Sequence, residues 1–306
     1  MRTLTIFLGM FLGAALVSGL LTYPVWSMLP SFLDVPIHRV MNRMGLLLLA
    51  IATIWYLRRH GLTNKLALGY SIPPRQFVRQ MLLGFVAGLI LIVPLVAVLL
   101  GLELRTWSPK LLDNAAPELF AAKLMASALL TGCAVAFIEE TFCRGALYAA
   151  IQRESGLAVA AVLSTVLYAA THFLGAEHKL PNDDYTYVSG LQIAAKLFER
   201  FTHPSDFVDA FLALAAFGAL LVLVRLRTGA IAMCVGIHAG AVTIITAIRR
   251  STIVNSEHSL SWLAGNYDGV VGLLACVWIG TVTFVYWRWT RPDREPQPVI
   301  VSAPAN

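Results

Sequence analysis

Charged residues are scarce in this chain. They make up 13% of its 306 residues, about half the share of an ordinary soluble domain, whereas 58% of the residues are hydrophobic. The mean hydropathy of +0.72 points the same way. Little sequence is left for a soluble domain, so the composition predicts an integral membrane protein.

Cysteine is also sparse, and several catalytic signatures are absent. The four cysteines form no CxxC pair, so neither a disulfide framework nor a zinc knuckle is indicated. The sequence has no HExxH motif, which leaves a zincin unsupported. It also has no GxSG or GxGD motif to suggest a serine or aspartyl intramembrane protease.

Long apolar runs are what the chain does contain. A run of roughly 17 to 25 apolar residues can cross about 30 Å of hydrocarbon. Such runs predict eight spans, at 4–27, 40–57, 81–101, 122–153, 156–174, 207–225, 229–248 and 269–289. We expect an all-α polytopic membrane protein with one transmembrane helical bundle at 1–289. The proline-rich segment 290–306 is expected to be a short disordered cytoplasmic tail. The polar linker 175–205 is either a lid or a connector.

Basic residues gather at the ends of these apolar runs. The densest cluster, between the second and third spans, holds Arg58, Arg59, Lys65, Arg75 and Arg79. The positive-inside rule assigns this loop to the cytoplasm, and eight crossings then place both termini there too. Because these topology signals account for the formal charge of +6, we expect the lipid bilayer as a partner and no nucleic acid.

A cluster of ionisable residues interrupts the fourth span. Within AFIEETFCRGALYAAIQ, Glu139, Glu140 and Arg144 stand in an otherwise apolar stretch. Glu140 and Arg144 are four residues apart and can pair on one helix face, while Glu139 points about 100° away. If one helix runs over 122–153, Glu139 lies about 25 Å from its outer end, inside the membrane. Ionisable groups at that depth usually mark function. The alternative places the cluster at a helix end among lipid headgroups.

Two histidines lie in other apolar spans. Counted from the inner ends of their helices, His172 lies about 24 Å deep and His238 about 14 Å deep, which brackets the depth of Glu139. Tyr168 precedes His172 by four residues, so its ring lies beside the imidazole. His238 stands within a GxxxG pattern that allows close helix packing. A lone histidine is more often structural, but two of them with an embedded Glu-Glu-Arg cluster favour a shared site.

A carboxylate and two imidazoles inside a membrane can hold and deprotonate a water for attack on a peptide carbonyl. The same three side chains, Glu139, His172 and His238, could instead bind Zn²⁺ with an open fourth position. The sequence does not choose between these mechanisms. No cofactor is required by it, and zinc stays open.

The three motifs resemble those of one family. EETFCR at 139–144 resembles the EExxxR motif of the CPBP family, the group of CAAX prenyl endopeptidases and bacteriocin-processing proteins. Residues 168–172 resemble its second motif, FxxxH, with Tyr168 in place of Phe. His238 resembles the histidine of its third motif, HxxxN. The resemblance covers a catalytic core at about 120–248.

This resemblance implies an eight-helix intramembrane endopeptidase, either glutamic or metal-dependent, that cleaves a membrane-associated protein or peptide. In it, Glu139 and His172 activate water, Glu140 and Arg144 support them, and His238 is an oxyanion donor or a metal ligand. Compact members are commonly bacterial, so the resemblance also implies a bacterial plasma membrane.

One position departs from the family pattern. Four residues after His238, where the third motif places Asn, the chain has Val242, which cannot donate a hydrogen bond. Loss of one oxyanion donor can cost on the order of 10² to 10³ in rate, unless another group such as Thr243 substitutes. Val242 therefore favours an alternative function, a non-catalytic peptide-binding immunity, resistance or scaffold protein. A proton-coupled transporter is a third hypothesis, weakened by the absence of a detectable repeat.

Overall fold

The computed structural model describes residues 2–112, 116–174 and 185–290, and these residues are almost entirely helical. Most of the predicted tail, 291–306, lies outside the described residues. The longer helices are α1 (Arg2–Ser27), α2 (Ile37–Arg59), α3 (Pro74–Gly101), α5 (Pro117–Glu140), α6 (Tyr148–Thr171), α8 (Val208–Thr228), α9 (Ala232–Ser251) and α10 (Leu273–Trp289). The short elements are α4 (Pro109–Leu112), α7 (Ser189–Ala195), β1 (Arg105–Trp107), β2 (Thr252–Val254) and the 3-10 turns Ser31–Leu33, Lys196–Thr202, Pro204–Asp206 and Ser261–Leu263.

Six helical segments in the described residues are long and apolar enough to cross a membrane. One of them, Pro117–Thr171, is 55 residues long and is broken at Gly156, whose φ of 82° no helix accommodates. The apolar helix α10 has 17 residues. The predicted all-α polytopic membrane protein is therefore confirmed. The number of crossings and the side on which the termini lie stay predictions.

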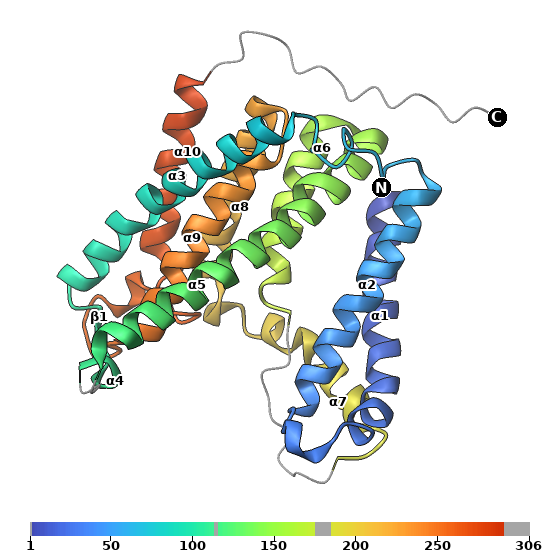
Figure 1. The fold of residues 1–306 in the computed structure, drawn as a ribbon, viewed down its shortest axis with the longest axis horizontal. Helices are drawn as coiled ribbons and strands as arrows, with labels where there is room; N and C mark the ends of the chain where they lie inside the picture. Colours follow the sequence, from blue (N-terminus) through green and yellow to red (C-terminus); the bar gives the residue numbers. More distant parts are fainter. Residues whose placement is uncertain (1, 113–115, 175–184, 291–306) are drawn as a thin grey trace.

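The long helix predicted over 122–153 differs from the structure in one respect. It is α-helical up to Glu140, continues as a π-helix over Thr141–Leu147, and becomes α-helical again at Tyr148. Figure 1 shows α5 crossing the molecule diagonally and α6 turning back at its end. The wider turn thus begins directly after the two glutamates, and such π-helical turns are frequent at functional sites.

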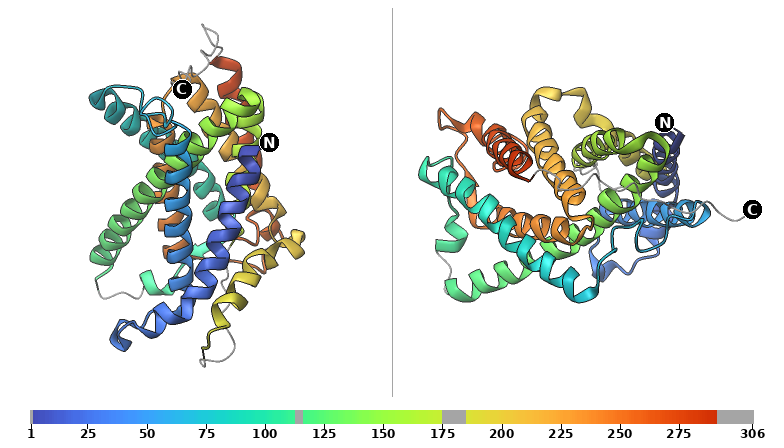
Figure 2. Two further views of the ribbon diagram at one scale, coloured as in Figure 1. Left: turned by 90° about the vertical axis from the view of Figure 1, so that its right-hand side faces the viewer. Right: turned by 90° about the horizontal axis from the view of Figure 1, so that it is seen from above.

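Helix α9 lies at the centre of the larger group of helices and packs against α3, α5 and α8. Its contact with α3 is unusually close because glycines face each other across it. A Cβ at Gly84 would lie 2.5 Å from the Met233 carbonyl oxygen, and one at Gly240 would collide with the Phe85 carbonyl. The GxxxG around His238 is therefore a packing seam that fixes α9 against α3 (Figure 2).

Helices α1, α2 and α7 form a second group (Figure 1). α7 belongs to the linker predicted over 175–205, of which residues 175–184 lie outside the described part. It packs on α1, where Gly190 and Gly19 bring the two backbones together. In its described part, this linker packs against the carboxyl-terminal half of α1.

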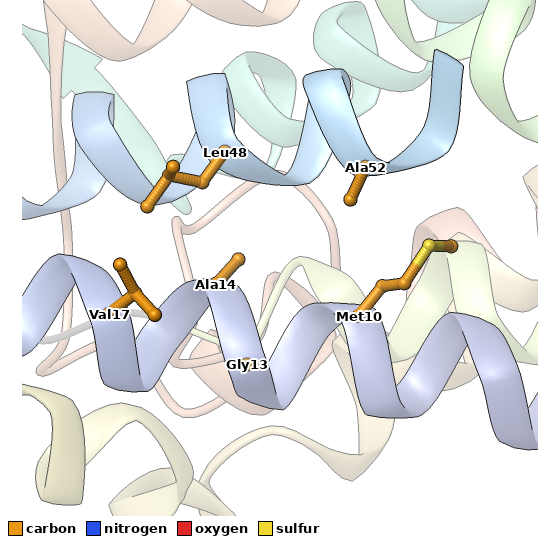
Figure 3. Close-up of a pocket in the computed structure, with 6 residues that line it drawn as sticks. All are labelled: Met10, Gly13, Ala14, Val17, Leu48 and Ala52. Atoms are coloured by element: carbon orange, nitrogen blue, oxygen red, sulfur yellow. The ribbon is translucent and has the colours of Figure 1, made fainter. Parts of the chain in front are cut away.

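A pocket of about 280 Å³ lies between α1 and α2 (Figure 3). Its lining is entirely apolar: Met10, Gly13, Ala14, Val17, Leu48 and Ala52. None of these side chains titrates, and the single thioether of Met10 does not make a metal site, so the chemistry of the protein is to be found elsewhere.

The end of the bundle opposite the basic loop is closed by a small antiparallel sheet of β1 and β2. Arg105 on β1 is buried, and its guanidinium donates hydrogen bonds to Thr252 and to the carbonyls of Asp268 and Gly269. Burial lowers the pKa of this guanidinium, and Asp268 opposes that effect. Arg105 ties the ends of α3 and α9 to the loop before α10.

Candidate active site

Glu140 and Arg144 form an ion pair within the protein interior. Arg144 donates to Glu140 Oε1 at 2.8 Å, and both side chains are 0% exposed. The pairing predicted from their four-residue spacing is therefore present, although Arg144 lies in the π-helical turn. Because a buried ion is costly without a partner, the two charges depend on one another.

Arg144 is held by two further contacts. Its guanidinium lies 4.2 Å above the centre of the Tyr168 ring, and it donates to the Gly218 carbonyl oxygen on α8 at 3.3 Å. A Cβ at Gly218 would lie 3.1 Å from the Tyr168 ring and 3.4 Å from Arg144. Glycine at 218 therefore lets α8 approach the pair closely enough to accept this hydrogen bond.

His238 joins the ion pair from α9. Its Nδ1 lies 2.8 Å from Glu140 Oε1, and its side chain is 2% exposed. Because a carboxylate oxygen accepts, Nδ1 carries the proton of this bond. In a neutral ring, Nε2 then bears a lone pair.

His172 caps the carboxyl end of α6 and is oriented by backbone groups. Its Nδ1 lies 2.8 Å from the Tyr168 carbonyl oxygen, which can only accept, so this nitrogen is also protonated. Tyr267 donates to the His172 carbonyl at 3.1 Å and fixes the end of the helix. The Nε2 of neutral His172 is again a lone-pair acceptor.

Glu139 brings the two imidazoles together. Its Oε2 lies 4.0 Å from His172 Nε2 and 3.9 Å from His238 Nε2. Glu139 is 35% exposed and His172 22%, so both can meet water, whereas His238 is closed off. Three electron-pair donors therefore face one another at distances too long for direct hydrogen bonds. The space between them suits a group that supplies protons or positive charge.

Water and a metal ion are the two candidates for that position. Ligand atoms about 2.0 to 2.1 Å from a tetrahedral zinc stand roughly 3.3 Å apart, which is closer than the 3.9 and 4.0 Å found here. Within the described residues, no group of three or more His, Cys, Asp or Glu side chains is arranged to hold a metal ion. The donor types suit zinc, but their spacing does not.

Thr243, the residue after Val242, offers no substitute donor for the missing motif residue. Thr243 donates its hydroxyl proton to the Ala239 carbonyl at 2.7 Å and packs against Gly132 of α5. It is buried within the α5–α9 contact and is already paired. Val242 remains an apolar side chain at the position that the family fills with Asn.

Several contributors to the site carry no signal in the sequence. Gly218 accepts from Arg144 through a backbone carbonyl, and any residue type has such a carbonyl. Tyr70, in the basic loop, shares a 2.6 Å hydrogen bond with Thr141, and the Leu68 carbonyl lies against Gly145. These contacts join the loop to the π-helical turn. Only the clustering of charge in that loop was visible in the sequence.

A comparison with known protein families matches the part of the chain that holds these site residues. The family model described as "Rce1-like: Type II CAAX prenyl endopeptidase Rce1-like" matches residues 121–244, a range that contains all three motifs. No significant match was found among curated proteins or solved structures.

Proposed function

We propose that the chain, a member of the CPBP family of CAAX-type intramembrane proteases through residues 121–244, hydrolyses a peptide bond with water activated by Glu139 and His172. The substrate is a membrane-associated protein or peptide, and the site lies within a bacterial plasma membrane. The observation that carries this proposal is the arrangement of Glu139 Oε2 opposite the Nε2 atoms of His172 and His238. Water can lie between the carboxylate, which acts as a base, and the two imidazole nitrogens, which accept hydrogen bonds.

The reaction needs one water and no other reagent. Glu139 accepts a proton from the water while His172 Nε2 accepts a hydrogen bond from its other hydrogen. The water oxygen bonds to the peptide carbonyl carbon, and the carbonyl oxygen becomes an oxyanion. When the C–N bond breaks, the proton held by Glu139 passes to the leaving amine. The direct products are a carboxylic acid and an amine, and the acid then gives up its proton to solvent or to the amine, which yields a carboxylate and an ammonium ion.

The buried residues keep Glu139 in position for this task. Glu140 is paired with Arg144 and accepts a hydrogen bond from His238, so its carboxylate has a structural role and does not act as the base. Glu139 is thereby the acidic residue of the pair that meets both water and the imidazoles. This division agrees with the exposed fractions of the two carboxylates, 35% and 0%.

The test is a comparison of membrane proteomes from cells that produce the wild type or Glu139→Gln, with new chain ends identified by terminal labelling. We expect a precursor to accumulate in the variant and its cleaved form to disappear. Glu118→Gln is the matched control, since Glu118 is an exposed residue of the same helix. The same cleavage in Glu139→Gln would refute the proposal.

Dialysis of purified enzyme against a strong chelator separates the two mechanisms, with a peptide released from the identified precursor as substrate. We expect cleavage to continue, because the spacing of the three side chains does not suit zinc. Loss of cleavage that added Zn²⁺ restores would assign the metal-dependent mechanism instead.

Val242 motivates a second candidate function, a non-catalytic protein that binds a peptide in the same cavity. A cellular phenotype that survives the double replacement Glu139→Gln and His172→Gln would mean binding. Loss of that phenotype together with the cleavage product would mean hydrolysis.

A further inference from the structure

Peptide hydrolysis needs a hydrogen-bond donor for the oxyanion, and the described residues leave few candidates. Arg144 is 0% exposed and engaged by Glu140 and Gly218. The Thr243 hydroxyl is engaged by Ala239, and Val242 has no donor. His238 uses its Nδ1 proton on Glu140, so in the neutral ring it has none left to offer.

Tyr168 has an uncommitted hydroxyl beside these residues. Its ring lies 4.8 Å from the His172 ring and 5.9 Å from the His238 ring, centre to centre, with Arg144 on its face. Within the part of the chain that the structure describes, the Tyr168 hydroxyl forms no hydrogen bond, although the residue is only 2% exposed. It differs in this from Tyr70 and Tyr267, whose hydroxyls are paired.

Tyr168 packs against both histidines that face Glu139. Glu139 Oε2 lies 4.0 Å from His172 Nε2 and 3.9 Å from His238 Nε2. The Tyr168 hydroxyl also keeps some accessible surface, unlike the Tyr148 hydroxyl, which is fully buried without a partner. Because the Tyr168 ring packs against both imidazoles that face Glu139, we place its hydroxyl beside the space where the reacting carbonyl must lie.

We propose that Tyr168 is a catalytic residue whose hydroxyl donates a hydrogen bond to the oxyanion and replaces the side-chain donor that is missing at Val242. A phenol is neutral and protonated under ordinary conditions, so it donates without a change of charge. It stands on α6 and is held by ring contacts on several sides, so it is oriented before the substrate binds. This inference rests on the proposed peptidase function.

Tyr168→Phe tests the hydroxyl alone, because the ring and its contacts with Arg144 and the two histidines are kept. We expect kcat to fall by about 10² to 10³ with KM changed by less than about threefold, since the oxyanion exists only along the reaction path. The melting temperature should stay that of the wild type. Tyr148→Phe is the matched control and should keep the wild-type kcat, since that buried hydroxyl lies outside the site.

A rescue variant distinguishes a lost donor from lost positioning. Val242→Asn in the Tyr168→Phe background returns a donor to the site and should recover kcat at least about tenfold. A wild-type kcat in Tyr168→Phe, or a loss that Val242→Asn leaves unchanged, would overturn the inference. Neither result would contradict the proposed function, which is refuted only if Glu139→Gln still cleaves the precursor.

Discussion

At the scale of single residues, the site divides its two adjacent glutamates by environment. Glu140 is closed off and accepts from Arg144 and His238 through one oxygen, while its second oxygen has no partner among the described residues. The four-residue spacing was enough to predict the ion pair, and helix depths were enough to bring His172 and His238 near Glu139. The Gly218 carbonyl was beyond prediction, because it depends on how closely α8 approaches.

Replacement of Arg144 tests how far the interior depends on this pair. Arg144→Met leaves Glu140 as a buried charge without its cation, so we expect the free energy of unfolding to fall by about 3–5 kcal/mol. The measurement is thermal or denaturant unfolding in detergent micelles. Arg75→Met, an exposed arginine at the start of α3, should unfold like the wild type. Equal stability of Arg144→Met and Arg75→Met would show that Glu140 does not need a partner.

At the scale of elements, the π-helical turn after Glu140 shows where sequence patterns stop being informative. The residues TFCRGAL have no local feature that demands a wider turn. The contacts that accompany it come from elsewhere in the chain, through Tyr70 on Thr141 and the Leu68 carbonyl against Gly145. Helix existence could therefore be predicted from apolar runs, whereas this change of helical pitch required the tertiary structure.

The glycine seam between α3 and α9 gives a prediction at the same scale. Gly240→Ala adds a methyl group that would collide with the Phe85 carbonyl, so the helices must separate. We expect a loss of about 1–3 kcal/mol in stability and a lower kcat, because α9 carries His238. Unfolding and cleavage measured together check both effects. Gly9→Ala on α1 is the control, since a Cβ there would meet nothing within 4 Å. If Gly240→Ala had the same stability and the same kcat as Gly9→Ala, the seam would not position His238.

At the scale of the whole molecule, the two helix groups are joined mainly at one end. Glu154 in the amino-terminal part of α6 accepts hydrogen bonds from the amides of Arg2 and Thr3 on α1, and Arg153 donates to the His60 carbonyl after α2. Figure 1 shows the start of α1 and the end of α10 at this same end. These contacts therefore lie beside the basic loop that follows α2.

This arrangement makes the topology testable by cysteine labelling in a variant that lacks the four native cysteines. Helix α9 is 20 residues long, about 30 Å, and begins beside Gly69 of the basic loop, so the loop after β2 must lie on the opposite side of the membrane. We expect Lys65→Cys and Trp289→Cys to react with a membrane-impermeant thiol reagent only from the cytoplasmic side, and Ser259→Cys only from outside. All three positions are exposed in the structure, so a lack of reaction reports membrane sidedness. Labelling of Trp289→Cys from outside would mean that α10 does not cross. Labelling of Lys65→Cys from outside would invert the topology and place Glu139 nearer the opposite face.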